Sequence, residues 1–270
     1  MMLANKNQWV KALLCLLTGL MVQAAFSGQL APAGKSVHFE KEPVQQTSFY
    51  SRFSPKNAQI PIQFGVFASR QGKSQDINMV DLIGDHFAVH KDNNINGLVG
   101  LGYYVNGYDS KYYELAVGVN AYYLAQQSVR GTVTQEQLFT NLAYGYAVTN
   151  YPIYLAAKAA LKNASDNYNV TLDLGLGPNI VHTSNFGETS IDGGVTLPDM
   201  AFSGRTRTAF SATAGMGLRL NNVFRNMPLE CGYRFFYLGA GGFNTINSQI
   251  LSDFKAGNAY ANALICSVTV

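Results

Sequence analysis

Residues 112–127 alternate between apolar side chains and small or polar ones with a period of two. Successive side chains of a strand point to opposite faces, so this segment predicts a β-strand with one apolar face. That face covers the ~9–11 residues that a tilted strand needs to cross a hydrocarbon core. Its tyrosines, Tyr113 and Tyr123, lie near the two ends, where the membrane interfaces would be.

The same alternation recurs along most of the chain. The further segments that show it are 60–69, 95–106, 134–148, 153–162, 168–181, 206–220, 229–239 and 260–270. Turn chemistry separates several of them, as at Asn106-Gly107, at Arg130-Gly131 and across 149–152. A bacterial barrel with both termini in the periplasm needs an even number of strands. A weak strand within 77–90 would give ten and omission of 60–69 would give eight; we favour ten.

The two faces of these segments differ in chemistry. One face is rich in leucine and aromatic residues, including Leu142, Tyr144, Leu174 and Phe210, and we assign it to lipid. The other is small and polar, with few charges of both signs. The charged residues predicted to form a lumen network are Glu114, Lys158, Asp173, Arg207, Arg219, Glu230 and Arg234. This pattern predicts an all-β fold, a transmembrane antiparallel up-and-down barrel with a narrow polar lumen.

The amino terminus has the three parts of a secretory signal peptide. Lys6 and Lys11 precede an apolar run at 12–22, and small residues follow it. The run is shorter than the ~20 residues of a spanning helix, so we predict export with residues 1–24 removed. Three prolines and mixed charge predict that residues 25–59 form a flexible periplasmic extension, which leaves 60–270 for the barrel.

Composition excludes several classes of function. Loss of the signal peptide removes two lysines from 19 basic and 16 acidic residues, so the mature chain carries a net charge of only +1. Without a basic tract we expect no nucleic-acid partner. The sequence contains no phosphate-binding loop, dinucleotide fingerprint, HExxH, GxSxG or paired CxxC motif. We therefore expect no cofactor, no metal and no catalytic residues.

Several segments carry a resemblance to a known group of proteins. They are LVGLGYYVNGY (98–108), ELAVGVNAYYL (114–124), LFTNLAYGY (138–146), LDLGLGPNI (172–180), FSATAGMGLRL (210–220) and LECGYRFFYLG (229–239). In this order they resemble the small OmpA-like, Opa-like and OmpW-like outer-membrane barrels of Gram-negative bacteria. The resemblance implies an outer-membrane monomer that contacts membrane lipid and lipopolysaccharide and is inserted by the barrel-assembly machinery. Such proteins usually end in an aromatic residue, whereas this chain ends in Val270.

The role that we favour is a structural or surface-recognition one through extracellular loops, similar to that of an adhesin or surface antigen. Two long connections, 183–205 and 241–258, fall on one side of the membrane and carry apolar side chains such as Phe186, Phe202 and Phe243. Loops on a rigid scaffold are where binding usually resides. A host or surface ligand would therefore bind to these two loops.

Two other roles remain open. Basic side chains outnumber acidic ones on the polar face, which would suit a narrow passive pore with weak anion preference. We favour a closed network of ion pairs because so small a barrel is readily filled by its side chains. A rim-located hydrolase similar to the omptin proteases would use Asp81, Asp85, His86 and His90, with His182 nearby. Their spacing does not match the omptin motifs, so we interpret them as a polar loop.

Cys231 and Cys266 are the cysteines that remain after processing. Their midpoint lies inside the 241–258 connection, so a hairpin centred there places them opposite each other on neighbouring strands. Both lie on the apolar face. Directly opposed residues are close enough for a disulfide, and an exported protein meets an oxidising compartment. We predict a cross-strand disulfide on the lipid face; a register shifted by two residues would leave two buried thiols instead.

Overall fold

The computed structural model describes residues 58–90, 95–163, 167–224 and 227–270. The predicted signal peptide and all of the predicted extension except 58–59 lie outside these ranges. The strands are β1 (Ala58–Gln59), β2 (Pro61–Arg70), β3 (Gln75–Ile77), β4 (Asp85–His90), β5 (Ile95–Asp109), β6 (Tyr113–Gln135), β7 (Phe139–Lys162), β8 (Tyr168–Ser190), β9 (Phe202–Ser203), β10 (Thr206–Phe224), β11 (Met227–Gly242), β12 (Asn244–Thr245) and β13 (Lys255–Thr269). Among the described residues, no helix is long and apolar enough to cross a membrane.

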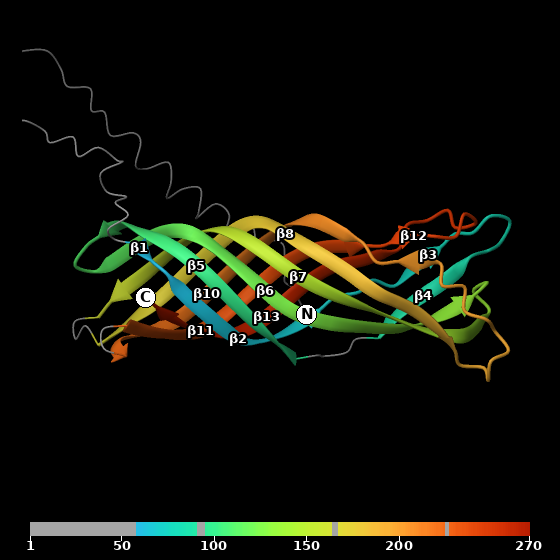
Figure 1. Ribbon diagram of the computed structural model, residues 1–270, viewed down its shortest axis with the longest axis horizontal. Helices are drawn as coiled ribbons and strands as arrows, with labels where there is room; N and C mark the ends of the chain where they lie inside the picture. The colour runs from blue at the N-terminus through green and yellow to red at the C-terminus, as the bar shows by residue number, and fades with distance from the viewer. Residues whose placement is uncertain (1–57, 91–94, 164–166, 225–226) are drawn as a thin grey trace, which may run out of the picture. The chain divides into compact units, whose positions relative to one another are not determined.

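The long strands close into an antiparallel barrel (Figure 1). Each pairs with its neighbours in the order β2, β5, β6, β7, β8, β10, β11 and β13, and β13 pairs back with β2. In the described part of the chain the ring therefore closes with eight strands, rather than the ten that we favoured. Segment 77–90 supplies β4, which lies outside the ring and pairs with the upper part of β6, and β3 pairs with β4.

The predicted turn at residues 149–152 is wrong, because β7 runs through it and joins two predicted strands into one. Pro152 has no amide hydrogen to give to a neighbouring strand. It pairs with Asn179 of β8, and the β6–β7 ladder has no partners between Ile153 and Asn150. The proline therefore lies where the ladder is already irregular, a place in a sheet that tolerates it. Arg130-Gly131, predicted as a turn, likewise lies inside β6.

The outer wall carries an apolar belt between two levels of tyrosine. On β6, Leu115, Val117 and Val119 are all more than 40% exposed between Tyr113 and Tyr123. The outward tyrosines at the loop-bearing level are Tyr123, Tyr151, Tyr237 and Tyr260, and they form two close pairs with ring centroids 5.5 and 5.4 Å apart. We call them the outer tyrosine ring. The distance between the two levels matches the ~9–11 residues of a membrane-crossing strand.

The long connections gather at the end of the barrel opposite to the carboxyl terminus (Figure 1). The rule that long loops face outside assigns this end to the cell exterior. Here β6, β7 and β8, at 23, 24 and 23 residues, continue well beyond the outer tyrosine ring. We call residues 71–90, 126–148, 181–205 and 240–258 the extracellular head.

The interior changes from polar to apolar where the barrel continues into the head. A register shift in β6 between Leu124 and Gln127 moves the inward positions from even to odd residue numbers. Above it the interior is apolar and aromatic. The ring-bearing residues that pack there are Phe87, Tyr144, Tyr146, Phe186, Phe202, Phe243 and Phe254. Leu142 and Tyr144, which we assigned to lipid, are 1% and 3% exposed inside this core.

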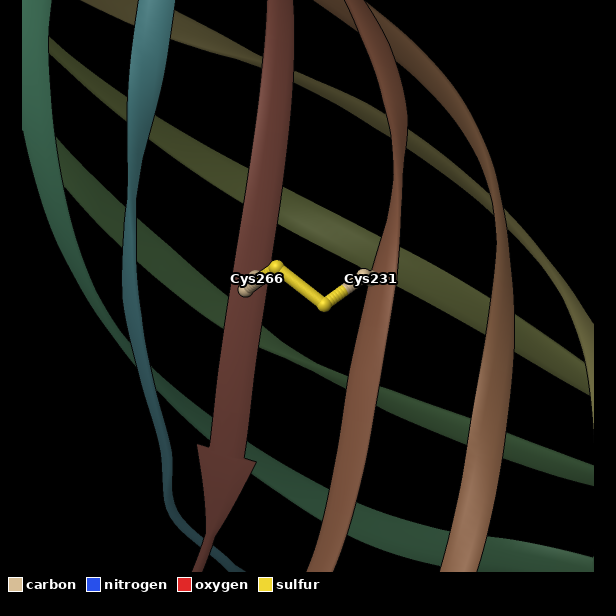
Figure 2. The surroundings of a disulfide bond; sticks show 2 residues. All are labelled: Cys231 and Cys266. Atoms are coloured by element: carbon tan, nitrogen blue, oxygen red, sulfur yellow. A yellow bond between two sulfur atoms is a disulfide. The ribbon is translucent and has the colours of Figure 1, made fainter.

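The final hairpin carries the disulfide (Figure 2). Cys231 of β11 and Cys266 of β13 are paired in register and joined, with a Cα–Cα distance of 4.0 Å. Both lie on the outward face, alongside Tyr233 and Leu264, which are 42% and 64% exposed. The bridge therefore fixes the register of two strands on the side that faces lipid.

We expect the purified protein to contain this bridge in full. Alkylation of denatured protein without reductant should add no alkyl group to its intact mass, and alkylation after reduction should add two. The double variant Cys231→Ser/Cys266→Ser should lose roughly 2–4 kcal/mol of unfolding free energy, as is typical for closing a loop of this kind. Two alkyl groups on unreduced protein would contradict the structure.

Candidate functional site

The lumen at membrane level is crossed by ion pairs. Lys158 Nζ lies 2.6 Å from Glu230 Oε2, and Arg234 Nη2 lies 2.6 Å from Asp173 Oδ1. A third pair joins Arg219 Nη2 to Glu114 Oε2 at 3.1 Å. Six of the seven predicted network residues are thus brought together as three neutral pairs. Buried charges need this arrangement, because an unpaired charge in so dry an interior would cost several kcal/mol.

Neutral groups complete the network. Arg234 also donates to the hydroxyl of Tyr122, which in turn donates to Gln63 Oε1 at 2.8 Å. Inward glycines make room for these large side chains. A Cβ at Gly100 would lie 2.5 Å from the Tyr122 ring, and one at Gly215 would lie 2.7 Å from Asp173 Oδ2. Small residues on one strand therefore accommodate a ring or a carboxylate from the next.

Little space remains around the network. The cavity beside Tyr104, Lys158 and Asp173 has a volume of about 20 Å³, which is room for roughly one water molecule. An apolar layer lies directly above, and its buried members include Phe67, Leu124, Tyr154, Phe236 and Leu238. The aromatic core of the head follows. The lumen is filled at three successive levels.

Among the described residues, basic side chains do not outnumber acidic ones in the lumen, contrary to the prediction. Arg207 is exposed near the outer end of β10 and forms no ion pair with a described residue. Its place in the network was wrong because Arg207 pairs with Val181, a residue of the extracellular head and not of the membrane-spanning part of β8. Lys162 pairs with Asp109 at the opposite end of the barrel. The remaining basic groups of the lumen are balanced by carboxylates.

The residues of the rim hydrolase hypothesis differ in burial and in their partners. Asp85 points inward and is 7% exposed, whereas His86 lies 2.6 Å from Asp76. His90 and Asp81 are exposed, and His182 contacts the Thr206 hydroxyl at 2.9 Å. No group of three or more described histidine, cysteine or acidic residues is arranged to hold a metal ion.

Two buried carboxylates hold the loops of the head, a feature that the sequence alone did not reveal. Asp85 Oδ1 accepts a hydrogen bond from the backbone N–H of Glu136 at 3.0 Å. Glu188 Oε2 accepts one from the backbone N–H of Asp199 at 3.1 Å. Burial raises the pKa of both carboxyl groups above their ordinary values, and neighbouring acidic groups raise it further.

The head loops form one hydrogen-bonded unit. Ile83 N donates to Glu136 Oε2 at 3.0 Å and Ile246 N donates to Ala201 O at 2.8 Å, so separate connections hold one another. Their aromatic residues, which we predicted to be a recognition surface, are mostly internal: Phe202 and Phe243 are 3% and 2% exposed. Other apolar residues are presented to solvent, and four of them lie in the two predicted loops. The strongly exposed apolar residues of the head are Ile83, Leu138, Phe139, Val195, Leu197, Ile246 and Leu251.

These features define the class of protein. In a closed antiparallel ring every strand has its backbone hydrogen bonds on both sides, so no edge is left open. The outer wall is apolar between two levels of tyrosine, and the lumen is polar and filled. This is an integral β-barrel protein of the bacterial outer membrane, in contact with membrane lipid and lipopolysaccharide.

The chain was compared with known proteins, and outer-membrane proteins are among the similar solved structures. No family model matches the chain, and no curated protein matches it. Similar solved structures include the outer membrane protein OprG of Pseudomonas aeruginosa, at 10% identity over 79% of this chain and 96% of that one, with a TM-score of 0.43. The outer membrane protease OmpT of Escherichia coli is 9% identical over 80% and 97%, with a TM-score of 0.45. Ail, the attachment invasion locus protein of Yersinia pestis, is 15% identical over 79% and 99%, with a TM-score of 0.34. None of these similarities assigns an activity to this chain.

We expect the ion pairs to be sensitive to the loss of a single partner. Arg234→Met should lower the free energy of unfolding by about 3 kcal/mol, because it leaves Asp173 buried and unpaired. Arg234→Met combined with Asp173→Leu should recover most of that loss. Urea unfolding in detergent micelles measures both variants. A double variant as unstable as the single one would argue against the pairing.

The buried carboxylates of the head should make stability depend on pH. Since their folded-state pKa is raised above the unfolded value, their contribution is fully present below the unfolded pKa, near 4, and is lost as the pH rises through the folded pKa. Unfolding free energies should therefore decrease from pH 4 upward. Asp85→Asn/Glu188→Gln should flatten this decrease, whereas Asp253→Asn, a change at another acidic residue of the head, should leave it intact.

Proposed function

We propose that this protein is a non-conducting, non-catalytic outer-membrane barrel that recognises other surfaces through its extracellular head. The observation that carries the proposal is that a filled barrel supports a compact head with exposed apolar side chains. In such a molecule, the side chains that a partner can reach are those at the tip of the head. Insertion by the barrel-assembly machinery and a monomeric state belong to the same proposal.

The filled lumen supports a structural role for the charged residues. Three neutral ion pairs, an apolar layer and an aromatic core lie one above another along the barrel axis. An ion that crossed would have to break these pairs in a space that has room for roughly one water molecule. This favours the closed network over the narrow pore.

The head supports recognition because it is pre-organised. Its connections are held by an internal aromatic core and by mutual hydrogen bonds, so little conformational entropy would be lost on binding. Leu138 and Phe139, at the β6–β7 turn, are 69% and 68% exposed. Apolar side chains that are held in water on a rigid scaffold are typical of contact surfaces.

Adhesion of whole cells tests this proposal. A non-adherent Gram-negative strain that displays the protein should bind to epithelial monolayers several-fold more than the strain without it. Leu138→Ser/Phe139→Ser should abolish the gain, because it removes the most exposed apolar pair of the turn. Tyr112→Ser, a change at an equally exposed residue of the opposite end, is the matched control.

Planar-bilayer recording of the purified protein tests the closed lumen separately. We expect no discrete conductance steps. Steps from the folded wild-type protein would favour the pore, and adhesion equal to that of the empty strain would remove the recognition role.

A further inference from the structure

A pocket of about 560 Å³ lies in the wall of the barrel just above the membrane. Residues from both faces of the wall line it: Gln127 and Val129 point inward on β6, whereas Arg70 and Tyr260 point outward on β2 and β13. Its volume is in the range of ordinary small-molecule sites. The pocket plays no part in the lumen network or in the tip of the head.

Two hydrogen-bond donors in the pocket have no acceptor as a partner. Gln127 is 2% exposed and accepts from the Ser69 hydroxyl at 2.9 Å, but its side-chain nitrogen has no partner. The side-chain nitrogen of Gln71 is likewise buried and unpaired. A buried donor without a partner costs about 1–3 kcal/mol, so two of them in one pocket indicate a ligand that supplies acceptors.

The lining also carries the positive charge of Arg70. Arg70 and His90 are exposed at the rim, and neither forms an ion pair with a described residue. No acidic side chain lines the pocket. A planar guanidinium together with amide donors suits an oxyanion with several acceptor oxygens, above all a phosphate group.

The level of the pocket identifies the source of that phosphate. Arg70 is paired in register with Tyr260, a member of the outer tyrosine ring, and both residues line the pocket. Asn258, two residues farther along the wall on β13, lines it as well. The pocket therefore begins where the hydrocarbon layer ends. Phosphorylated head groups of the outer leaflet lie at this depth.

We propose that this pocket binds the phosphorylated sugar head group of an outer-leaflet lipid. Arg70 contacts the phosphate from the membrane side, and the amides of Gln71 and Gln127 donate to its oxygens from within the wall. His90 closes the upper rim. The site is independent of surface recognition by the head, so loss of one would leave the other intact.

Native mass spectrometry of the full-length protein released from lipid nanodiscs tests the proposal. The discs contain lipid A with its phosphates, or the same lipid without them. Wild-type protein should retain one phosphorylated lipid A. Arg70→Gln and Gln127→Leu should each lower that occupancy about tenfold, whereas Arg207→Gln, a change at an exposed arginine outside the pocket, should not.

Heat-modifiable migration on a gel first establishes that each variant is folded, and Arg70→Gln keeps the test decisive if Gln127→Leu fails to fold. Equal retention of lipid with and without phosphate would overturn the proposal, as would full occupancy in Arg70→Gln. Absence of retained lipid in wild type would also overturn it. Inorganic phosphate that displaces the lipid at equal concentration would show a site for free anions rather than for lipid.

Discussion

Lipid offers no hydrogen-bond partner to a peptide group, and the rest of this structure depends on that constraint. Every strand that crosses the membrane must satisfy its backbone on both sides, which only a closed ring achieves. Here β13 returns to β2, and Cys231 and Cys266 tie the last two strands together next to that seam. Closure with eight strands leaves an interior that side chains fill.

The narrow interior explains why its charges occur as pairs. A single arginine in this space would be desolvated without compensation, but Arg234 faces Asp173 and Tyr122, and Lys158 faces Glu230. Such pairs contribute little net stability compared with apolar packing, yet each is costly to break. The ion pairs fill the lumen with one defined arrangement of side chains.

The head is built by continuing the same strands into water. Outside the membrane the wall no longer meets lipid, and a single extra residue in β6 changes which side chains of that strand point inward. The interior becomes aromatic, and the loops fold over it with their phenylalanines inside. An internal core therefore holds the loops as a fixed surface, and the base of the head contains a polar pocket at the lipid boundary.

The period-two pattern determined the fold class, the outward face of most strands and the level of the tyrosines, because side-chain direction along a strand is a local property. It also predicted six of the lumen charges and the opposition of the two cysteines, since simple register counting reaches across one hairpin. The tertiary structure alone decided the number of strands, the inward turn of Leu142 and Tyr144, and the exclusion of Arg207 from the lumen. The number of strands and the inward position of Leu142 and Tyr144 depend on β7 running through the predicted turn, and the place of Arg207 depends on its pairing with Val181. These are settled by neighbouring strands that are distant in the sequence.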